Sequence, residues 1–283
     1  MPGSYWKQVH ATGLAVPQDR PLDDLTAELT RMLGDPDPAQ RDGTAYPTLT
    51  TWIDRGVYDD LLAGLGDGMA IGLQVGIGEV GTDTVFRRSF SALVLGECIA
   101  RDNHRPLLPG GKILEWGDRL AAWLLRERDL RAFVPGKGWA HAVAHGADSL
   151  AILASSPHLA QPELTVILDV IADRVLLRVD RLFTNGEPDR LAFATMNVLR
   201  RNVVPLRVLE PWVRRLAVAA STRSTYDGRD PYLLGGNAEA FLRALYLQLA
   251  MGARPPQVRS DLLLVVVDAL KATNSAFLSA TGE

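Results

Sequence analysis

The chain has 283 residues, of which 47% are hydrophobic and 22% are charged, and its formal net charge is -3. This composition is that of a protein that buries a large core, and it lacks the basic excess typical of nucleic-acid-binding proteins. The single cysteine excludes an internal disulfide, and the longest strongly apolar run, residues 262–267, is far too short to cross a bilayer. The N-terminal residues do not have the pattern of a secretory signal. We therefore expect a cytoplasmic protein with neither a nucleic-acid nor a membrane partner.

In chain order, residues 1–20 show no clear period and are expected to form a loose lead-in, followed by a single helical-repeat domain over residues 21–283. Apolar residues at helical spacing predict a first helix over residues 22–33. A second helix over residues 39–55 contains Pro47, which is expected to kink or break it. Further helices are predicted over residues 59–73, 83–101, 111–128, 139–154, 162–179, 188–202, 206–220, 237–250 and 260–273. No run alternates apolar and polar residues, so the predicted fold class is all-α.

The spacing of these helices indicates a repeat. Alternate helices begin near positions 39, 83, 139, 187 and 237, and their partners begin near positions 58, 111, 162, 206 and 260. Five helix pairs with a period of roughly 50 residues predict a HEAT-like α-solenoid, with a closed α/α toroid as the alternative. The first helices of the pairs are expected to line one surface.

The chemically informative residues are concentrated in the segment 136–148, GKGWAHAVAHGAD. On a helix, His141, His145 and Asp148 would fall at roughly 0°, 40° and 340° and so share one stripe. The stripe is compatible with a zinc site, with metal-free acid–base chemistry in which Asp148 fixes a histidine tautomer, or with a polar network that is structural or binds a ligand. The glutamate that usually follows the first histidine in such zinc motifs is replaced by Ala142. We therefore predict no metal and no cofactor.

The segment 76–81, GIGEVG, matches the dinucleotide-binding fingerprint letter by letter. That fingerprint requires a preceding strand and a βαβ unit, and here a long helix follows with no strand after it. The segment is instead expected to be a flexible loop that leads into Thr82 and Asp83 as helix caps. Glu79 in this loop is a candidate to form one wall of a pocket.

Several residues near these motifs are candidate ligand contacts. Asp83 and Arg87 are four residues apart and are expected to pair on a helix surface, although Arg87 or Arg88 also suits a carboxylate or phosphate. Lys137 lies between two glycines whose backbone N–H groups would favour an anion. Trp139 is a candidate to stack on a ligand. Ser89 and Ser149 are able to approach a histidine in the fold, although their sequence context does not indicate a catalytic triad.

These segments together resemble a known family. The resemblance rests on Arg41-Asp42 with Tyr46-Pro47, on residues 78–91, and above all on the long segment 136–148. The chain resembles, over about residues 30–200, a bacterial family catalogued as a domain of unknown function, number 2785. The resemblance implies one contiguous domain and favours no particular reaction.

We therefore expect a helical-repeat protein that binds a small polar or anionic ligand, or a peptide, in a concave pocket. The pocket would be centred on His141, His145 and Asp148, with Arg87 and Lys137 nearby. The alternative is an enzyme that uses the same pocket for metal-free His/Asp acid–base chemistry, as a hydrolase, lyase or cyclase. A HEAT-like base-excision protein is disfavoured by the charge balance, and the sequence makes no prediction of oligomeric state.

Overall fold

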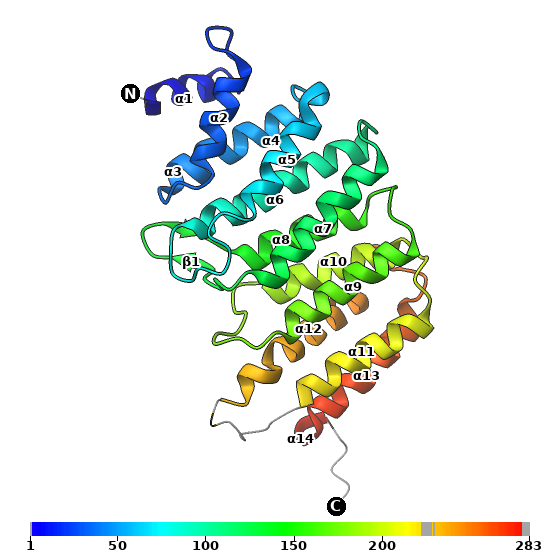
Figure 1. Cartoon of the computed structure of the whole chain (residues 1–283). Coiled ribbons are helices and arrows are strands. Elements are labelled where there is room, and N and C mark those ends of the chain that lie inside the picture. Colours follow the sequence, from blue (N-terminus) through cyan, green and yellow to red (C-terminus); the bar gives the residue numbers. More distant parts are fainter. Residues whose placement is uncertain (1, 222–227, 229, 279–283) are drawn as a thin grey trace, which may run out of the picture. The chain divides into compact units, whose positions relative to one another are not determined.

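The computed structural model describes residues 2–221, 228 and 230–278, and the regular secondary structure of these residues is almost entirely helical (Figure 1). The prediction of an all-α fold class is confirmed. The chain divides into two compact units, Met1–Ser149 and Leu150–Glu283, and the boundary falls within helix α8. The expectation of a single domain over residues 21–283 stays a prediction.

The first unit holds the helices from α1 to the beginning of α8. Helix α5 packs on both α6 and α7, and α4 packs on α6. A two-stranded antiparallel hairpin precedes α8. The elements are α1 (Pro2–Ala11), α2 (Leu22–Met32), α3 (Pro38–Gln40), the π-helix η1 (Arg41–Ala45), α4 (Tyr46–Asp54), the 3₁₀ helix η2 (Asp59–Leu61), α5 (Leu62–Gly72), α6 (Thr84–His104), α7 (Gly110–Arg126), β1 (Phe133–Val134), β2 (Gly138–Trp139) and α8 (Ala142–Ala154).

The second unit, like the first, is built from helices that pack on one another. Helix α12 packs on α10, and α11 packs on both α9 and α13. Leucine, valine and alanine side chains form its core. The elements are α9 (Gln161–Leu176), α10 (Glu187–Arg200), α11 (Leu206–Ser221), α12 (Tyr232–Met251), α13 (Arg259–Thr273) and α14 (Ser275–Leu278).

The N-terminal residues differ from the expected loose lead-in, because they contain helix α1. Trp6 and Val9 on this helix are buried. The indole N–H of Trp6 donates to Glu28 at 2.8 Å, and its ring lies 6.3 Å from that of Trp52. Only two residues of this helix are buried apolar anchors, which is too few to produce a recognisable period in the sequence.

The expected break at Pro47 takes the form of a π-helix. The backbone N–H of Tyr46 bonds to the carbonyl of Arg41, five residues earlier. Pro47 has no N–H with which to continue a regular α-helical ladder from the preceding turn. The wider turn of η1 leaves Arg41 completely buried. Single π-helical turns of this kind recur at functional sites.

Two further observations concern the apolar parts of the chain. Cys98 is fully buried on α6, and burial raises the pKa of its thiol, as expected for a cysteine that packs as a small hydrophobic residue. Among the residues described, no helix combines the length and the apolar character needed to span a membrane.

Two glycines on α5 provide a matched test of this packing. A Cβ at Gly66 would overlap the indole of Trp116 on α7, whereas a Cβ at Gly68 would meet no atom within 4 Å. We predict that Gly66→Ala lowers the free energy of unfolding by about 1–3 kcal/mol, because the ring has to move. Gly68→Ala is expected to raise it by about 0.5–1 kcal/mol. Urea denaturation of both variants measures the difference, and equal effects would contradict the packing of α5 on α7.

Candidate functional site

The candidate site is built on residues 127–141, which connect α7 to α8 and contain the β1–β2 hairpin. Phe133 pairs with Trp139 across the hairpin, and Val134 pairs with Gly138. Pairing continues past the strands, because Ala140 donates its N–H to the Ala132 carbonyl at 2.8 Å. The hairpin therefore delivers the chain to the first turn of α8.

A buried ion pair anchors the start of this connection. Arg88 on α6 and Glu127 after α7 contact each other at 2.6 Å, and neither side chain is exposed. The guanidinium also donates to the carbonyls of Val75 and Gly76, at 2.9 and 2.8 Å. The GIGEVG segment is therefore a loop whose start is fixed by hydrogen bonds from the buried Arg88. Its glycines at 76, 78 and 81 all have positive φ values, which explains their spacing without a nucleotide.

Asp129 forms a second anchor between the two loops. Its carboxylate accepts the Gly81 N–H at 2.9 Å and pairs with Arg131 at 2.7 Å. Burial alone would raise the pKa of Asp129, but the hydrogen bonds from Arg131 and from backbone N–H groups outweigh burial and leave that pKa lowered. Arg131 in turn donates to the carbonyl of Thr82.

Arg41 supports the hairpin from η1. Its guanidinium donates to the carbonyls of Lys137 and Asp35, at 2.7 and 2.8 Å. It also lies 4.1 Å from the ring centroid of Phe86 and 5.0 Å from that of Phe90. Burial lowers the pKa of Arg41, and the ion pair with Asp42 at 2.6 Å opposes this shift. The aromatic faces and the carbonyls compensate for a further part of the lost hydration.

His141 does not lie on a helix as the sequence predicted, because α8 begins at Ala142 and not at residue 139. His141 has a left-handed backbone with φ +49°, and its carbonyl accepts the first helical bond, from the His145 N–H at 2.9 Å. Its imidazole stacks on the Trp139 indole, with centroids 4.8 Å apart and planes 23° apart. Helical periodicity carries no information about such a left-handed residue at the end of a hairpin.

The protonation of His145 is set by its neighbours. The Ser89 hydroxyl on α6 donates to the Ala140 carbonyl, so its single proton is committed. The short contact of 2.6 Å between Ser89 Oγ and His145 Nδ1 then requires Nδ1–H to donate. In the neutral imidazole the acceptor is consequently Nε2. A serine nucleophile would need the opposite arrangement, with the serine donating to the histidine.

A second serine, on α8, donates a hydrogen bond to the backbone of α6. Ser149 Oγ lies 2.8 Å from the Ala92 carbonyl and 2.9 Å from the His145 carbonyl. Ser89 and Ser149 are both completely buried.

The two histidines belong to a row of rings that begins at the surface. Phe133 is 55% exposed and Trp139 is 41% exposed, whereas His141 and His145 are only 6% and 7% exposed. Successive centroids are 4.8–5.9 Å apart. This aromatic row consists, in order, of Phe133, Trp139, His141, His145, Phe90 and Tyr46.

The inner end of the aromatic row meets carboxylates. The Tyr46 hydroxyl donates to Glu97 at 3.2 Å. Burial raises the pKa of both groups, and the negative charges of Glu97 and Asp148 raise the pKa of Tyr46 further. Asp148 therefore acts electrostatically on Tyr46. Sequence reasoning missed Tyr46 and Glu97 as site residues, although a carboxylate within the apolar run of residues 92–99 was a usable signal.

The predicted ligand contacts are not all brought together. Lys137 Nζ contacts both carboxylate oxygens of Asp83 at 2.7 Å, so the expected Asp83–Arg87 pair does not form and the lysine charge is compensated. Asp83 occupies the N-cap position of α6 without a side-chain cap bond. Glu79 accepts hydrogen bonds from Thr82 and Thr84 within its own loop.

Arg87 points away from the histidines. It is two residues from Ser89, which places the two side chains about 200° apart around α6. Its side chain packs beside Gly34, which lies just after α2, and beside Gly72, which is the last residue of α5. Burial lowers the pKa of Arg87. Sequence proximity alone therefore grouped residues that lie on opposite faces of one helix.

The described residues contain no group of three or more His, Cys, Asp or Glu side chains positioned to hold a metal ion. Comparison with protein families gave a match over residues 73–247 to the family described as Protein of unknown function (DUF2785). This match confirms the resemblance found in the sequence. Neither the curated proteins nor the solved structures gave a match.

Removal of the Ser89 hydroxyl tests the assignment of the histidine tautomer. In Ser89→Ala, Nδ1 of His145 loses its acceptor, so we expect the neutral imidazole to leave the Nδ1–H form. Long-range ¹H–¹⁵N correlation spectra distinguish the two tautomers directly. The free energy of unfolding should fall by about 1–3 kcal/mol, because buried polar groups lose a partner. An Nε2–H tautomer in the unsubstituted protein would contradict the assignment.

Proposed function

The chain belongs to the DUF2785 family of proteins of unknown function, and we propose from its own geometry that it binds a small polar ligand at the exposed end of the aromatic row. The ligand would place a planar group against Trp139 and Phe133 and exchange hydrogen bonds with His141 and His145. Asp148 would supply a nearby negative charge.

The observation that carries this proposal is the backbone of His141. A residue with a Cβ at φ +49° costs roughly 1–2 kcal/mol relative to an ordinary conformation. Glycine or asparagine would fill the position with less strain. Strain of this kind is characteristic of binding and catalytic sites, where a side chain has to be held in one place.

The electrostatics favour a polar ligand over a strongly anionic one. Lys137 was the predicted counter-charge for an anionic ligand, but it is paired with Asp83. Arg41 is buried beneath the hairpin, where it bonds to the Lys137 carbonyl. The exposed aromatic surfaces of Trp139 and Phe133 provide stacking area at little cost in side-chain entropy.

The scaffold for this site is proposed to be a HEAT-like α-solenoid. The helix starts recur about every 50 residues, and within each unit a helix packs on the next but one along the chain, as α4 on α6 and α10 on α12. Such arrays form extended concave binding surfaces. Tyr46, Ser89 and His145 come from the first helices of three helix pairs.

The proposal predicts that planar polar probes perturb two particular histidines. The chain has five histidines, so their imidazole Cε1–H resonances are assignable by single substitutions. We expect nicotinamide, adenosine and 4-hydroxybenzamide, unlike glycerol, to shift the resonances of His141 and His145 saturably. Trp139→Ala should weaken these responses at least fivefold. His10, on α1, serves as the internal control.

The variant His141→Asn separates binding from stability. Asparagine tolerates the left-handed backbone, so thermal unfolding should be nearly unchanged while the probe responses are lost. A large loss of stability with retained probe binding would support a structural role for His141. If none of the planar probes shifts either histidine at millimolar concentration, the binding proposal fails.

A second candidate function, metal-free acid–base catalysis, is favoured by one specific observation. Ser89 fixes His145 with Nε2 as the acceptor, which is the orientation of a general base held by a positioning residue. The raised pKa of Glu97 keeps a larger fraction of this buried carboxyl protonated than in an ordinary glutamate. Phe90 lies between His145 and Tyr46, the residue whose hydroxyl donates to Glu97.

An ester probe tests this candidate. We expect the chain to hydrolyse p-nitrophenyl acetate at least tenfold faster than the variant His145→Gln, and expect His104→Gln to match the unsubstituted protein. Equal rates for the two variants would exclude His145 as a base.

A further inference from the structure

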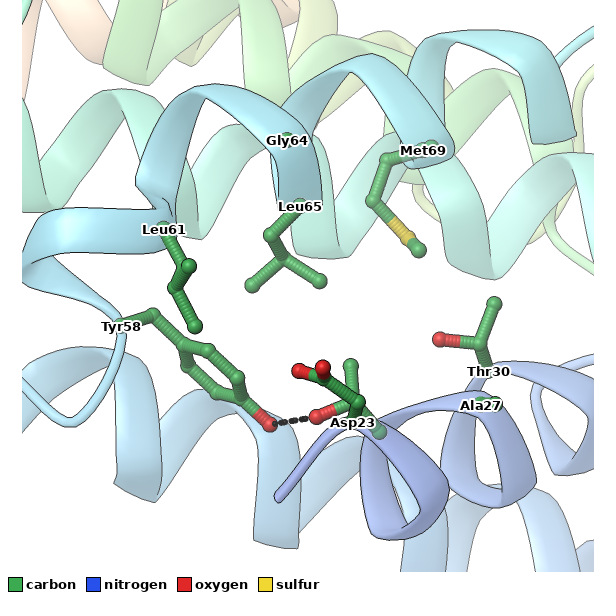
Figure 2. Close-up of a pocket in the computed structure, with 10 residues that line it drawn as sticks. Asp23, Ala27, Thr30, Tyr58, Leu61, Gly64, Leu65 and Met69 are labelled. Atoms are coloured by element: carbon green, nitrogen blue, oxygen red, sulfur yellow. Dashed lines mark hydrogen bonds between the residues drawn. The ribbon is translucent and has the colours of Figure 1, made fainter. Parts of the chain in front are cut away.

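The first unit carries a groove that plays no part in the site at the histidines. It lies between α2 and the segment formed by η2 and α5, and it encloses about 340 Å³ (Figure 2). This volume is at the lower end of the range for small-molecule sites. Its two walls come from helices separated by about 40 residues in the chain.

One wall of the groove is apolar. Tyr58, Leu61, Leu65 and Met69 line it, and in Figure 2 their side chains extend from the η2–α5 side toward α2. Leu61 is 48% exposed. A Cβ at Gly64, which also lines the groove, would meet no atom within 4 Å. The groove is therefore deepened by a glycine that has no packing reason to be small.

Oxygen atoms of Tyr58, on the apolar wall, and of Thr26 and Asp23, on the α2 wall, lie together at one end of the groove. The Thr26 hydroxyl donates to the Leu22 carbonyl at 2.8 Å, so in its 2.9 Å contact with Tyr58 it must accept. The phenol proton of Tyr58 is thereby used, and its oxygen retains only acceptor capacity. The carboxylate of Asp23 points into the groove in Figure 2, and it forms no ion pair with any described residue.

The charge around the groove has one sign. No lysine, arginine or histidine lines it. Residues 19–70, which supply both walls, contain eleven acidic and four basic residues. Asp59 pairs with Arg101 and Arg105, and Asp67 pairs with Lys112, so part of this charge is compensated from outside the segment. Such a local excess attracts cations and disfavours anions. A ligand that complements this groove combines an apolar body with a positive charge.

We propose that this groove binds a small hydrophobic amine in its protonated form. The apolar part lies along Leu61, Leu65 and Met69, and the ammonium group donates to Asp23 and to the Tyr58 oxygen. The site is separate from the aromatic row, so the proposal stands independently of the function proposed there.

Three six-carbon probes of different charge test the ligand class. With the full chain, n-hexylamine should bind more tightly than n-hexanol, and hexanoate should bind most weakly, as measured by titration of methyl resonances from Leu65 and Met69. Asp23→Asn should weaken hexylamine binding about fivefold or more, and added salt should weaken it as well. Asp24→Asn is the matched control, because it removes the same charge from the same helical turn without lining the groove.

A blocking variant tests the location independently of charge. Gly64→Leu would place a side chain in the open groove, so hexylamine binding should be lost while thermal stability is kept or raised. Gly111→Leu on α7 is the control, because a Cβ there also meets no atom within 4 Å and lies outside the groove. The proposal is overturned if hexylamine and hexanol bind equally, if Asp24→Asn weakens binding as much as Asp23→Asn, if Gly64→Leu leaves binding intact, or if hexylamine gives no saturable response.

Discussion

The buried pair of Arg88 and Glu127 is the interaction on which the candidate site depends. Removing two charges from water is expensive unless each is fully hydrogen-bonded. Here the guanidinium also bonds to the carbonyls of the GIGEVG loop, and the carboxylate accepts the backbone N–H groups of Arg128 and Asp129 at 2.9 Å. One ion pair thereby fixes the start of the loop between α5 and α6 and the start of the connection after α7.

The remaining contacts extend this fixed point toward the histidines. Asp129 joins the two loops, and Arg41 holds the hairpin at the Lys137 carbonyl. The arginine reaches that carbonyl because the π-helical turn buries its side chain beneath the hairpin. The site therefore combines short-range backbone geometry at residue 41 with contacts that span 39 to 96 residues of sequence.

These spans explain what the sequence was able to predict. The all-α class followed from apolar periodicity, and the family followed from the segments around Arg41, residues 78–91 and residues 136–148. Periodicity also placed His141 and His145 close together, and their rings are 5.8 Å apart. Periodicity placed the start of α8 at residue 139 and not at Ala142, because a left-handed residue at the end of a hairpin does not alter the spacing of apolar residues. It also paired Asp83 with the neighbour in sequence, Arg87, whereas the actual partner, Lys137, is 54 residues away.

The two buried serines between α6 and α8 have a mechanical consequence. Ser89 on α6 bonds to a carbonyl at the entrance of α8, and Ser149 on α8 bonds to a carbonyl of α6, so each helix holds the backbone of the other. The two bonds meet α6 at Ser89 and Ala92, less than one turn apart, and they oppose sliding of one helix along the other. A force applied to the hairpin would therefore reach α6 directly through the Ser89 hydroxyl, which bonds to Ala140 just before α8 begins.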